Sequence, residues 1–227
     1  MAKKKERIEE QMIAVESALS RSERFIEENY KLLLGIFAGI LVIVVGIFGY
    51  AKYIKEPREI EAQSQIFMAQ RYFEMDSLNL ALNGDGMFLG FLAIADDYSS
   101  TKAGKLANYY AGISYLKMGD FDSAIEYLDK FSSKDEIVSC MAIGAKADAY
   151  LEKGDNAKAI KLYKEAAKKK DNEFTSPMFM FKAGLVLEME NQWAEALDLY
   201  KTIKTDYFRS YEAQEIDKYI ARAEANL

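Results

Sequence analysis

Residues 117–128 read KMGDFDSAIEYL, and this stretch decides the fold because its outline returns twice further along the chain. It returns as KGDNAKAIKL at residues 153–162 and as ENQWAEALDL at residues 190–199. When the three stretches are aligned, Ala124, Ala159 and Ala196 occupy one position, at spacings of 35 and 37 residues. A period of this length is typical of proteins built from stacked helix pairs.

The positions around each alanine carry residues of matching size. Twelve residues before the alanine stands a small residue, and four residues after it stands a larger one. Small residues let two helices approach closely, and large residues fill the space beside them. The pattern predicts two antiparallel helices per unit that meet through these residues: Gly112, Ala147 and Gly184 in the first helices, and Leu128, Tyr163 and Tyr200 in the second helices.

The repeated stretch also contains the turn between the two helices. Gly119, Gly154 and Asn191 share one position, and these residue types accept the left-handed conformation that ends a helix. Asp120 and Asp155 follow, where a carboxylate can accept hydrogen bonds from the free N–H groups of the next helix. The glycines and acids are therefore predicted to be turn and cap residues, not parts of an active-site loop.

This arrangement resembles the tetratricopeptide repeat family, whose units of about 34 residues carry small, aromatic and alanine signatures at these intervals. The resemblance covers roughly Lys105–Thr205. The proline that usually stands near the end of each repeat is absent, and Glu136, Asp171 and Phe208 take its place. The resemblance implies an all-α fold, with an α-solenoid of three repeats over residues 101–209, an atypical first repeat within residues 52–100 and a C-terminal capping helix over residues 210–227.

The atypical first repeat is expected to start with a helix over Glu59–Met75. A loop around ALNGDGM follows, and then a second helical stretch, GFLAIADDY. The NGDG sequence at residues 83–86 lacks the ligand pattern of a calcium loop and the GK[ST] of a phosphate loop, so it is expected to be an inter-helix turn. The first helix is expected to bury one face of apolar residues: Ile60, Phe67, Met68, Tyr72 and Met75.

Residues 32–51, LLLGIFAGILVIVVGIFGYA, contain no charge. As a helix this run is about 30 Å long, which is the thickness of a bilayer's hydrocarbon core, so a single transmembrane helix is expected. The 31 residues before it carry seven Lys and Arg residues, whereas the 20 residues after it carry four. By the positive-inside rule, residues 1–31 stay in the cytoplasm and the chain from Lys52 onward lies across the membrane.

The leader, residues 1–31, carries an apolar stripe of its own. Ile8, Met12, Val15 and Leu19 are spaced by four, three and four residues, which places them on one side of a helix. An amphipathic leader of this kind can form a short coiled coil or lie on the inner membrane surface. The spacing leaves both interpretations open.

The composition excludes several kinds of chemistry. The chain has no histidine and one cysteine, so catalytic pairs with histidine, histidine-based metal sites and an intramolecular disulfide are excluded. Cys140 is expected to be a small core residue. With 30 basic and 36 acidic residues and no long basic block, no nucleic-acid surface is expected. Glu152 and Glu188 are expected to be solvated charges on separate repeats, so no enzymatic activity, cofactor, metal or small-molecule substrate is predicted.

The first helix of each repeat is expected to line a protein-binding groove. The side chains expected there are apolar, methionine-containing and partly acidic, a mixture that suits extended or apolar protein segments. The family's basic clamp for chaperone C-termini is absent, because Tyr109 and Ile113 stand at its positions. The predicted groove residues are Leu106, Tyr109, Ile113, Lys117, Met141, Asp148, Glu152, Met178, Phe181, Leu185 and Glu188.

A cytoplasmic leader, one anchor and a repeat domain together resemble the ancillary SecYEG translocon subunit (YfgM-like) family, in its Bacteroidetes-type versions. The phrases YYAGISYLKMGDFDSAIEYL and TSPMFMFKAGLVLE add to the resemblance. It implies a bacterial inner-membrane protein whose repeat domain is periplasmic. The implied partners are translocon subunits, periplasmic chaperones or exported polypeptides. An envelope scaffold for cell division, wall synthesis or another secretion complex is the alternative function.

Overall fold

The computed structural model describes the backbone of residues 2–227 and the side chains of residues 25, 26 and 28–227. The chain forms two compact units, Met1–Pro57 and Arg58–Leu227. Over the described residues the regular structure is helical, with one isolated bridge between Gly84 and Leu89. The predicted all-α fold is confirmed.

The first unit contains α1, Ala2–Tyr50, and the π-helix η1, Ala51–Lys55. This part of the chain is long and apolar enough to cross a membrane, and none of its most apolar window is buried against protein. Such a fully exposed apolar surface is unfavourable in water. The predicted leader stripe, Ile8 to Leu19, lies outside the residues whose side chains the structure describes.

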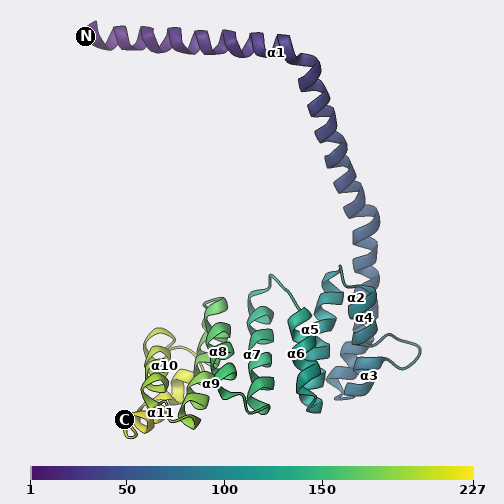
Figure 1. Cartoon of the computed structure of the whole chain (residues 1–227), viewed down its shortest axis with the longest axis vertical. Coiled ribbons are helices and arrows are strands. Elements are labelled where there is room, and N and C mark those ends of the chain that lie inside the picture. The colour runs from purple at the N-terminus through teal and green to yellow at the C-terminus, as the bar shows by residue number, and fades with distance from the viewer. Residues whose placement is uncertain (1) are drawn as a thin grey trace. The chain divides into compact units, whose positions relative to one another are not determined.

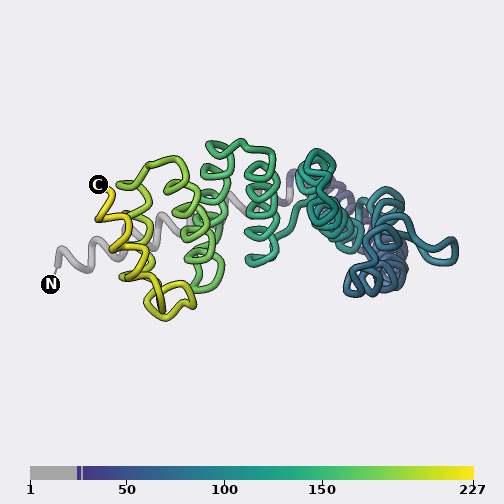
Figure 2. Tube along the Cα trace, turned by 90° about the horizontal axis from the view of Figure 1, so that it is seen from below, coloured from purple at the N-terminus to yellow at the C-terminus, as the bar shows by residue number. Residues whose placement is uncertain are grey.

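The second unit is a series of helices in which successive pairs stand one beside the next (Figures 1 and 2). The three repeats are the pairs α5 with α6, α7 with α8, and α9 with α10. The helices are α2, Glu56–Glu74; α3, Leu78–Asn83; α4, Phe91–Asp97; α5, Lys102–Met118; α6, Phe121–Lys130; α7, Glu136–Glu152; α8, Asn156–Lys169; α9, Thr175–Met189; α10, Trp193–Asp206; and α11, Ile216–Glu224.

The small residues predicted at the helix crossings lie against the predicted large ones. A Cβ atom added to Gly112 would stand 2.5 Å from Cγ of Leu128, and one added to Gly184 would stand 2.4 Å from Cε1 of Tyr200. Both distances are too short for a contact between carbon atoms. With the neighbouring side chain in its present position, only glycine fits at each crossing. The three register alanines, Ala124, Ala159 and Ala196, are fully buried.

The predicted turns are also confirmed. Gly119, Gly154 and Asn191 have φ values of 81°, 79° and 58°, in the left-handed region. Asp120 accepts a hydrogen bond from the Ser123 N–H, and Asp155 caps α8 in the same way. The hydroxyl and the N–H of Ser123 lower the pKa of Asp120, as expected for a carboxylate that caps a helix.

The buried face of α2 agrees only in part with the predicted one. Met68 is half-buried and Tyr72 packs against the core, as expected. Ile60 and Phe67 are 63% and 57% exposed, and Met75 beyond the helix is also exposed. The core instead receives Ala62, Ile66 and Ala69, spaced by four and three residues, which pack with Phe91 and Ile94 of α4. The prediction assumed that the largest apolar side chains are buried, whereas alanines are buried where the helices pack closely.

The expected loop around ALNGDGM is partly helical, because α3 covers its first residues. The NGDG sequence forms a turn in which Gly84 and Gly86 have positive φ. The Asp85 carboxylate accepts hydrogen bonds from the Tyr72 hydroxyl at 2.6 Å and from the N–H groups of Met87 and Phe88. Asp85 therefore holds the turn closed through groups of the chain itself.

The repeat unit has two main hydrophobic cores. The first lies under α2 to α5, and the second extends from α7 to α11 and contains Cys140. Between them lies a smaller cluster, in which Leu128 of α6 meets Ala142 and Ala145 of α7. The junction between the first and second repeats therefore holds the smallest of the three buried clusters.

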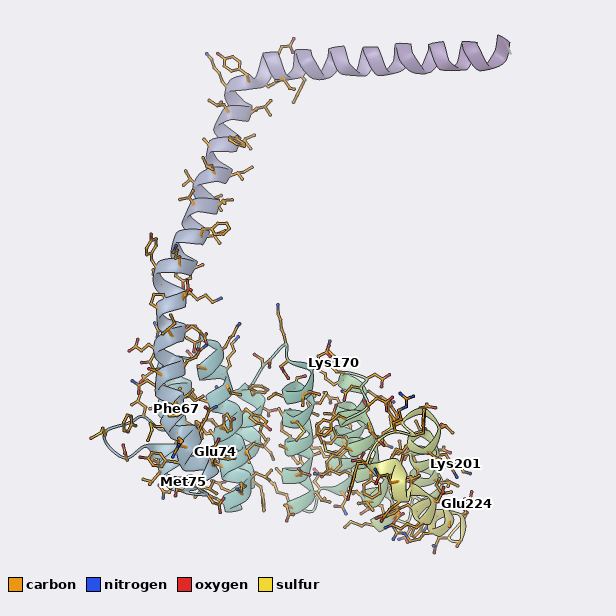
Figure 3. All side chains as sticks on the ribbon, turned by 180° about the vertical axis from the view of Figure 1, so that it is seen from behind. Phe67, Glu74, Met75, Lys170, Lys201 and Glu224 are labelled. Carbon is orange, nitrogen blue, oxygen red and sulfur yellow. The ribbon has the colours of Figure 1, made fainter. Side chains whose placement is uncertain are left out.

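The chain ends in the predicted capping helix, but this helix is shorter than residues 210–227. A 3-10 turn, Glu212–Glu215, precedes α11, which starts at Ile216. Ile216 is 1% exposed and joins the second core. An ion pair of 3.1 Å between Lys201 and Glu224 links α10 to α11 (Figure 3). The cap covers the apolar face that the last repeat would otherwise leave in water.

Candidate protein-binding surface

The predicted groove residues lie on α5, α7 and α9, the first helices of the three repeats. We call their side chains together the first-helix surface. Neighbouring first helices contact each other, α5 with α7 and α7 with α9, and each packs on the second helix of its own repeat. The register that the sequence predicted therefore brings these residues onto consecutive helices.

On α5, three of the predicted residues pack between helices and keep part of their surface open. Leu106 packs against the first core, while Tyr109 and Ile113 pack against the small cluster at Leu128. The Tyr109 ring centre lies 5.4 Å from that of Phe131, and burial raises the pKa of the Tyr109 hydroxyl. These side chains give the first repeat a half-buried aromatic and aliphatic surface.

Lys117 lies near the end of α5 and is exposed. Its Nζ forms an ion pair of 2.5 Å with Asp76 and stands 5.3 Å from the Phe73 ring centre. Both partners lie in or just after α2, so Lys117 links the first repeat to the atypical one. As an exposed pair, it contributes little to stability.

On α7, Asp148 belongs to a polar network. Its carboxylate accepts hydrogen bonds from the hydroxyl of Tyr163 on α8 and from Nζ of Lys182 on α9, the latter at 2.7 Å. Burial and this hydrogen bond raise the pKa of Tyr163 well above its usual range. Met141 packs partly against the second core. Asp148 therefore joins three helices of two consecutive repeats.

On α9, Glu188 has the same role one repeat later. Its carboxylate accepts hydrogen bonds from the Tyr200 hydroxyl at 3.0 Å and pairs with Arg222 of α11 at 2.5 Å. Its side chain is only 10% exposed, so the expectation of a solvated charge was wrong for Glu188. The reason is that α11 folds over this end of α9. Glu152, in contrast, is exposed as expected.

Phe181 is also covered by the capping helix. Its ring meets that of Tyr219 edge to face, with centres 4.7 Å apart, and lies 6.1 Å from Tyr200. Met178 packs partly against the second core and Leu185 is half-buried. At α9, the predicted surface is thus partly exposed to solvent and partly covered by α11.

The sequence interpretation missed one residue. Met189 stands five residues after Gly184, as Lys117 and Glu152 stand five residues after Gly112 and Ala147. It is 64% exposed. The repeat register alone was sufficient to predict Met189. The repeat pattern did not indicate Lys182 and Arg222, the cations that pair with Asp148 and Glu188.

Over the residues with described side chains, the arrangement offers a mixed apolar and polar surface. Glu152 and Glu188 share no partner, and the two buried tyrosine hydroxyls are both bonded to carboxylates. Among the residues with described side chains, no group of His, Cys, Asp and Glu could hold a metal ion. What the surface presents is half-buried apolar side chains between fixed polar networks.

Comparison with known families agrees with this geometry. Tetratricopeptide repeat profiles match residues 106–135 and residues 145–207. Among curated proteins, none matches the chain. The chain therefore carries tetratricopeptide repeats, which are interaction modules as a class, and an N-terminal helix that could span a membrane.

Proposed function

We propose that this protein is a membrane-anchored, non-enzymatic adaptor that holds other proteins on its first-helix surface. The observation that carries the proposal is the surface itself: three repeats present half-buried apolar and methionine side chains on consecutive helices. Methionine and aromatic side chains adapt to varied apolar segments. The single apolar helix near the N-terminus supplies the anchor.

The compartment follows from the distribution of basic residues. Seven Lys and Arg residues precede the apolar run and four follow it within 20 residues, which favours a cytoplasmic N-terminus. In a bacterial inner membrane the repeat domain is then periplasmic. There it serves as an ancillary component of the Sec translocon, and its partners are translocon subunits, periplasmic chaperones or exported polypeptides.

Affinity purification from detergent-solubilised membranes tests the adaptor role. The full chain is compared with Met189→Glu, which places a charge on the first-helix surface, and with Ala157→Glu, a matched change at an exposed position of α8. We expect channel subunits or exported proteins to co-purify with the wild type and with Ala157→Glu, and to be depleted with Met189→Glu. Equal recovery with all three would contradict the proposed surface, and recovery of wall synthases alone would contradict the translocon role.

A further inference from the structure

The buried apolar residues of the repeat unit are divided at the junction between the first and second repeats. The first core ends in α5 and the second begins in α7, and among the described residues no buried side chain belongs to both. The small cluster of Leu128, Ala142 and Ala145 lies between them. Because a close-packed core resists deformation, each core moves as one body. We call residues 58–130 the first body and residues 136–227 the second body.

The second and third repeats, in contrast, are joined through a buried ring. Phe179 of α9 is 1% exposed, stacks on Tyr163 with ring centres 6.3 Å apart, and lies directly against Gly144 of α7. Ala142 holds the position of Phe179 one repeat earlier, 37 residues before it. Tyr109, which packs against the small cluster around Ala142, keeps part of its surface exposed. Over the described side chains, the junction between the first and second repeats therefore contains no buried ring.

The loops at the two junctions are also fastened differently. In the loop between α8 and α9, the Asn172 side chain accepts a hydrogen bond of 2.7 Å from the N–H of Thr175. The Tyr207 hydroxyl, after α10, donates a hydrogen bond of 2.6 Å to Asp171 of the same loop. In the loop between α6 and α7, residues 131–135, the side-chain hydrogen bonds of the described residues stay within the loop and the first turn of α7. This loop can therefore change its backbone angles without breaking a side-chain hydrogen bond to another repeat.

Two ion pairs cross the junction between the first and second repeats. Asp129 of α6 pairs with Lys146 of α7 at 2.7 Å, and Asp122 of α6 pairs with Lys153, which directly follows α7. The two aspartate side chains are 58% and 83% exposed, so dissolved salt screens both pairs. The two bodies are thus held together by a small apolar cluster and by charges that respond to ionic strength.

We propose that residues 131–135 are a hinge between the two bodies and that the two ion pairs hold this hinge closed. Hinges are a few loop residues whose backbone angles change while the packed bodies on either side stay intact. Tyr109 and Ile113 lie on the first body, whereas Met141 and Met178 lie on the second. Opening the hinge changes the spacing between these two halves of the first-helix surface. The hinge rests on the repeat unit alone, so it can fail or hold independently of the proposed adaptor role.

Distances between spin labels test the hinge. Because Cys140 is fully buried, introduced cysteines can be labelled selectively in the full chain. The pair Met118→Cys with Ala194→Cys spans the junction, whereas the matched pair Ala157→Cys with Ala194→Cys lies within the second body. All three positions are exposed and lie near the helix ends away from residues 131–135. Double electron-electron resonance gives the distribution of distances for each pair in detergent, at low salt and at about 1 M salt.

We expect the distance distribution for positions 118 and 194 to be at least about twofold wider at high salt than at low salt. The distribution for positions 157 and 194 should stay unchanged, because both labels lie on one body. A distribution across the junction that salt does not widen would overturn the inference, and so would equal widening of both pairs.

Charge reversal tests the role of the two ion pairs at low salt. Lys146→Glu with Lys153→Glu should widen the distribution across the junction, and the further changes Asp129→Lys with Asp122→Lys should narrow it again. Lys161→Glu with Lys168→Glu, on the exposed side of α8, is the charge-matched control and should leave both distributions unchanged. No widening on reversal, no rescue by the exchanged charges, or the same widening in the control would show that the ion pairs do not hold the hinge.

Discussion

Tyr163 and Tyr200 occupy the same repeat position, where the ring packs between helices and the hydroxyl forms a hydrogen bond. The Tyr200 ring lies over Gly184 of the preceding helix. Each of the two hydroxyls donates a hydrogen bond to a carboxylate of the preceding helix, Asp148 or Glu188. The first repeat has Leu128 at this position and makes no such bond. The first and second repeats are linked instead by ion pairs of Lys146 with Asp129 and of Lys153 with Asp122.

Tyr163→Phe removes one hydroxyl and leaves the ring. Asp148 then keeps Lys182 as its partner but loses a hydrogen bond in a partly buried place, so we expect the free energy of unfolding to fall by about 1 kcal/mol. Chemical denaturation of the purified protein measures the change. Tyr211→Phe, at an 82% exposed side chain, should leave the free energy unaltered. An equal loss in both variants would show that the network does not stabilise the fold.

Alkaline pH should weaken the same networks. Burial and hydrogen bonds to carboxylates raise the pKa of Tyr163 and Tyr200 well above the ordinary value of 10.0, and they raise the pKa of Tyr207 to about 12. The folded state thus holds these protons more tightly than the unfolded state. The resulting stabilisation is complete below about pH 10 and is lost as the pH rises above it.

Denaturation curves between about pH 8 and pH 11 therefore should show a falling free energy of unfolding. The double variant Tyr163→Phe and Tyr200→Phe should show a shallower fall in the free energy of unfolding. Both proteins contain the lysines, which titrate in this range, but only the wild type contains the two tyrosine hydroxyls. Identical slopes would mean that the two hydroxyls carry no pH dependence.

Among the secondary-structure elements, the short helix α11 stabilises the end of the last repeat. It supplies Arg222 to Glu188 and Tyr219 to Phe181, and it buries Ile216 in the second core. A short helix of this kind depends on tertiary packing, because isolated helices of its length are marginal in water. Its removal would expose the apolar face of the last repeat.

Arg222→Ala tests that role. It leaves the Glu188 carboxylate, which is 10% exposed, without its cation, so we expect a loss of about 1–2 kcal/mol in the free energy of unfolding, partly restored by Arg222→Lys. Lys218→Ala on the same helix removes an exposed pair with Glu215 and should have no measurable effect. Thermal or chemical denaturation of the three variants provides the comparison, and a neutral Arg222→Ala would contradict the role given to α11.

The repeat register was predictable from the sequence because it rests on short-range rules. Asp120 caps a helix three residues on, and Gly119 ends one, so neither needs knowledge of distant contacts. The partners of Glu188 were not predictable, since Arg222 lies 34 residues away on a helix outside the repeat pattern. The face of α2 was predicted only in part for a related reason: which of its apolar residues are buried depends on packing against residues distant in the sequence, and the core takes Ala62 and not Ile60.

For the whole molecule, the apolar run and the basic leader favour the proposed topology, in which the leader is cytoplasmic and the repeat domain lies across the membrane. We expect a protease added to intact cells with a permeabilised outer membrane to digest the repeat domain, and the same protease to leave it intact when the outer membrane is whole. The cytoplasmic leader should resist in both cases. A repeat domain that is cleaved only after the inner membrane is lysed would place it in the cytoplasm and contradict the proposed compartment.

Site-specific photo-crosslinking in living cells shows directly whether the first-helix surface holds other proteins. A photoreactive amino acid is placed at Lys117 or Met189 on this surface, and at Lys161 or Asp198 on the exposed sides of α8 and α10. We expect crosslinks to translocon subunits, periplasmic chaperones or exported chains from the first two positions and few from the others. Crosslinks only from Lys161 and Asp198, or from none of the four positions, would contradict it.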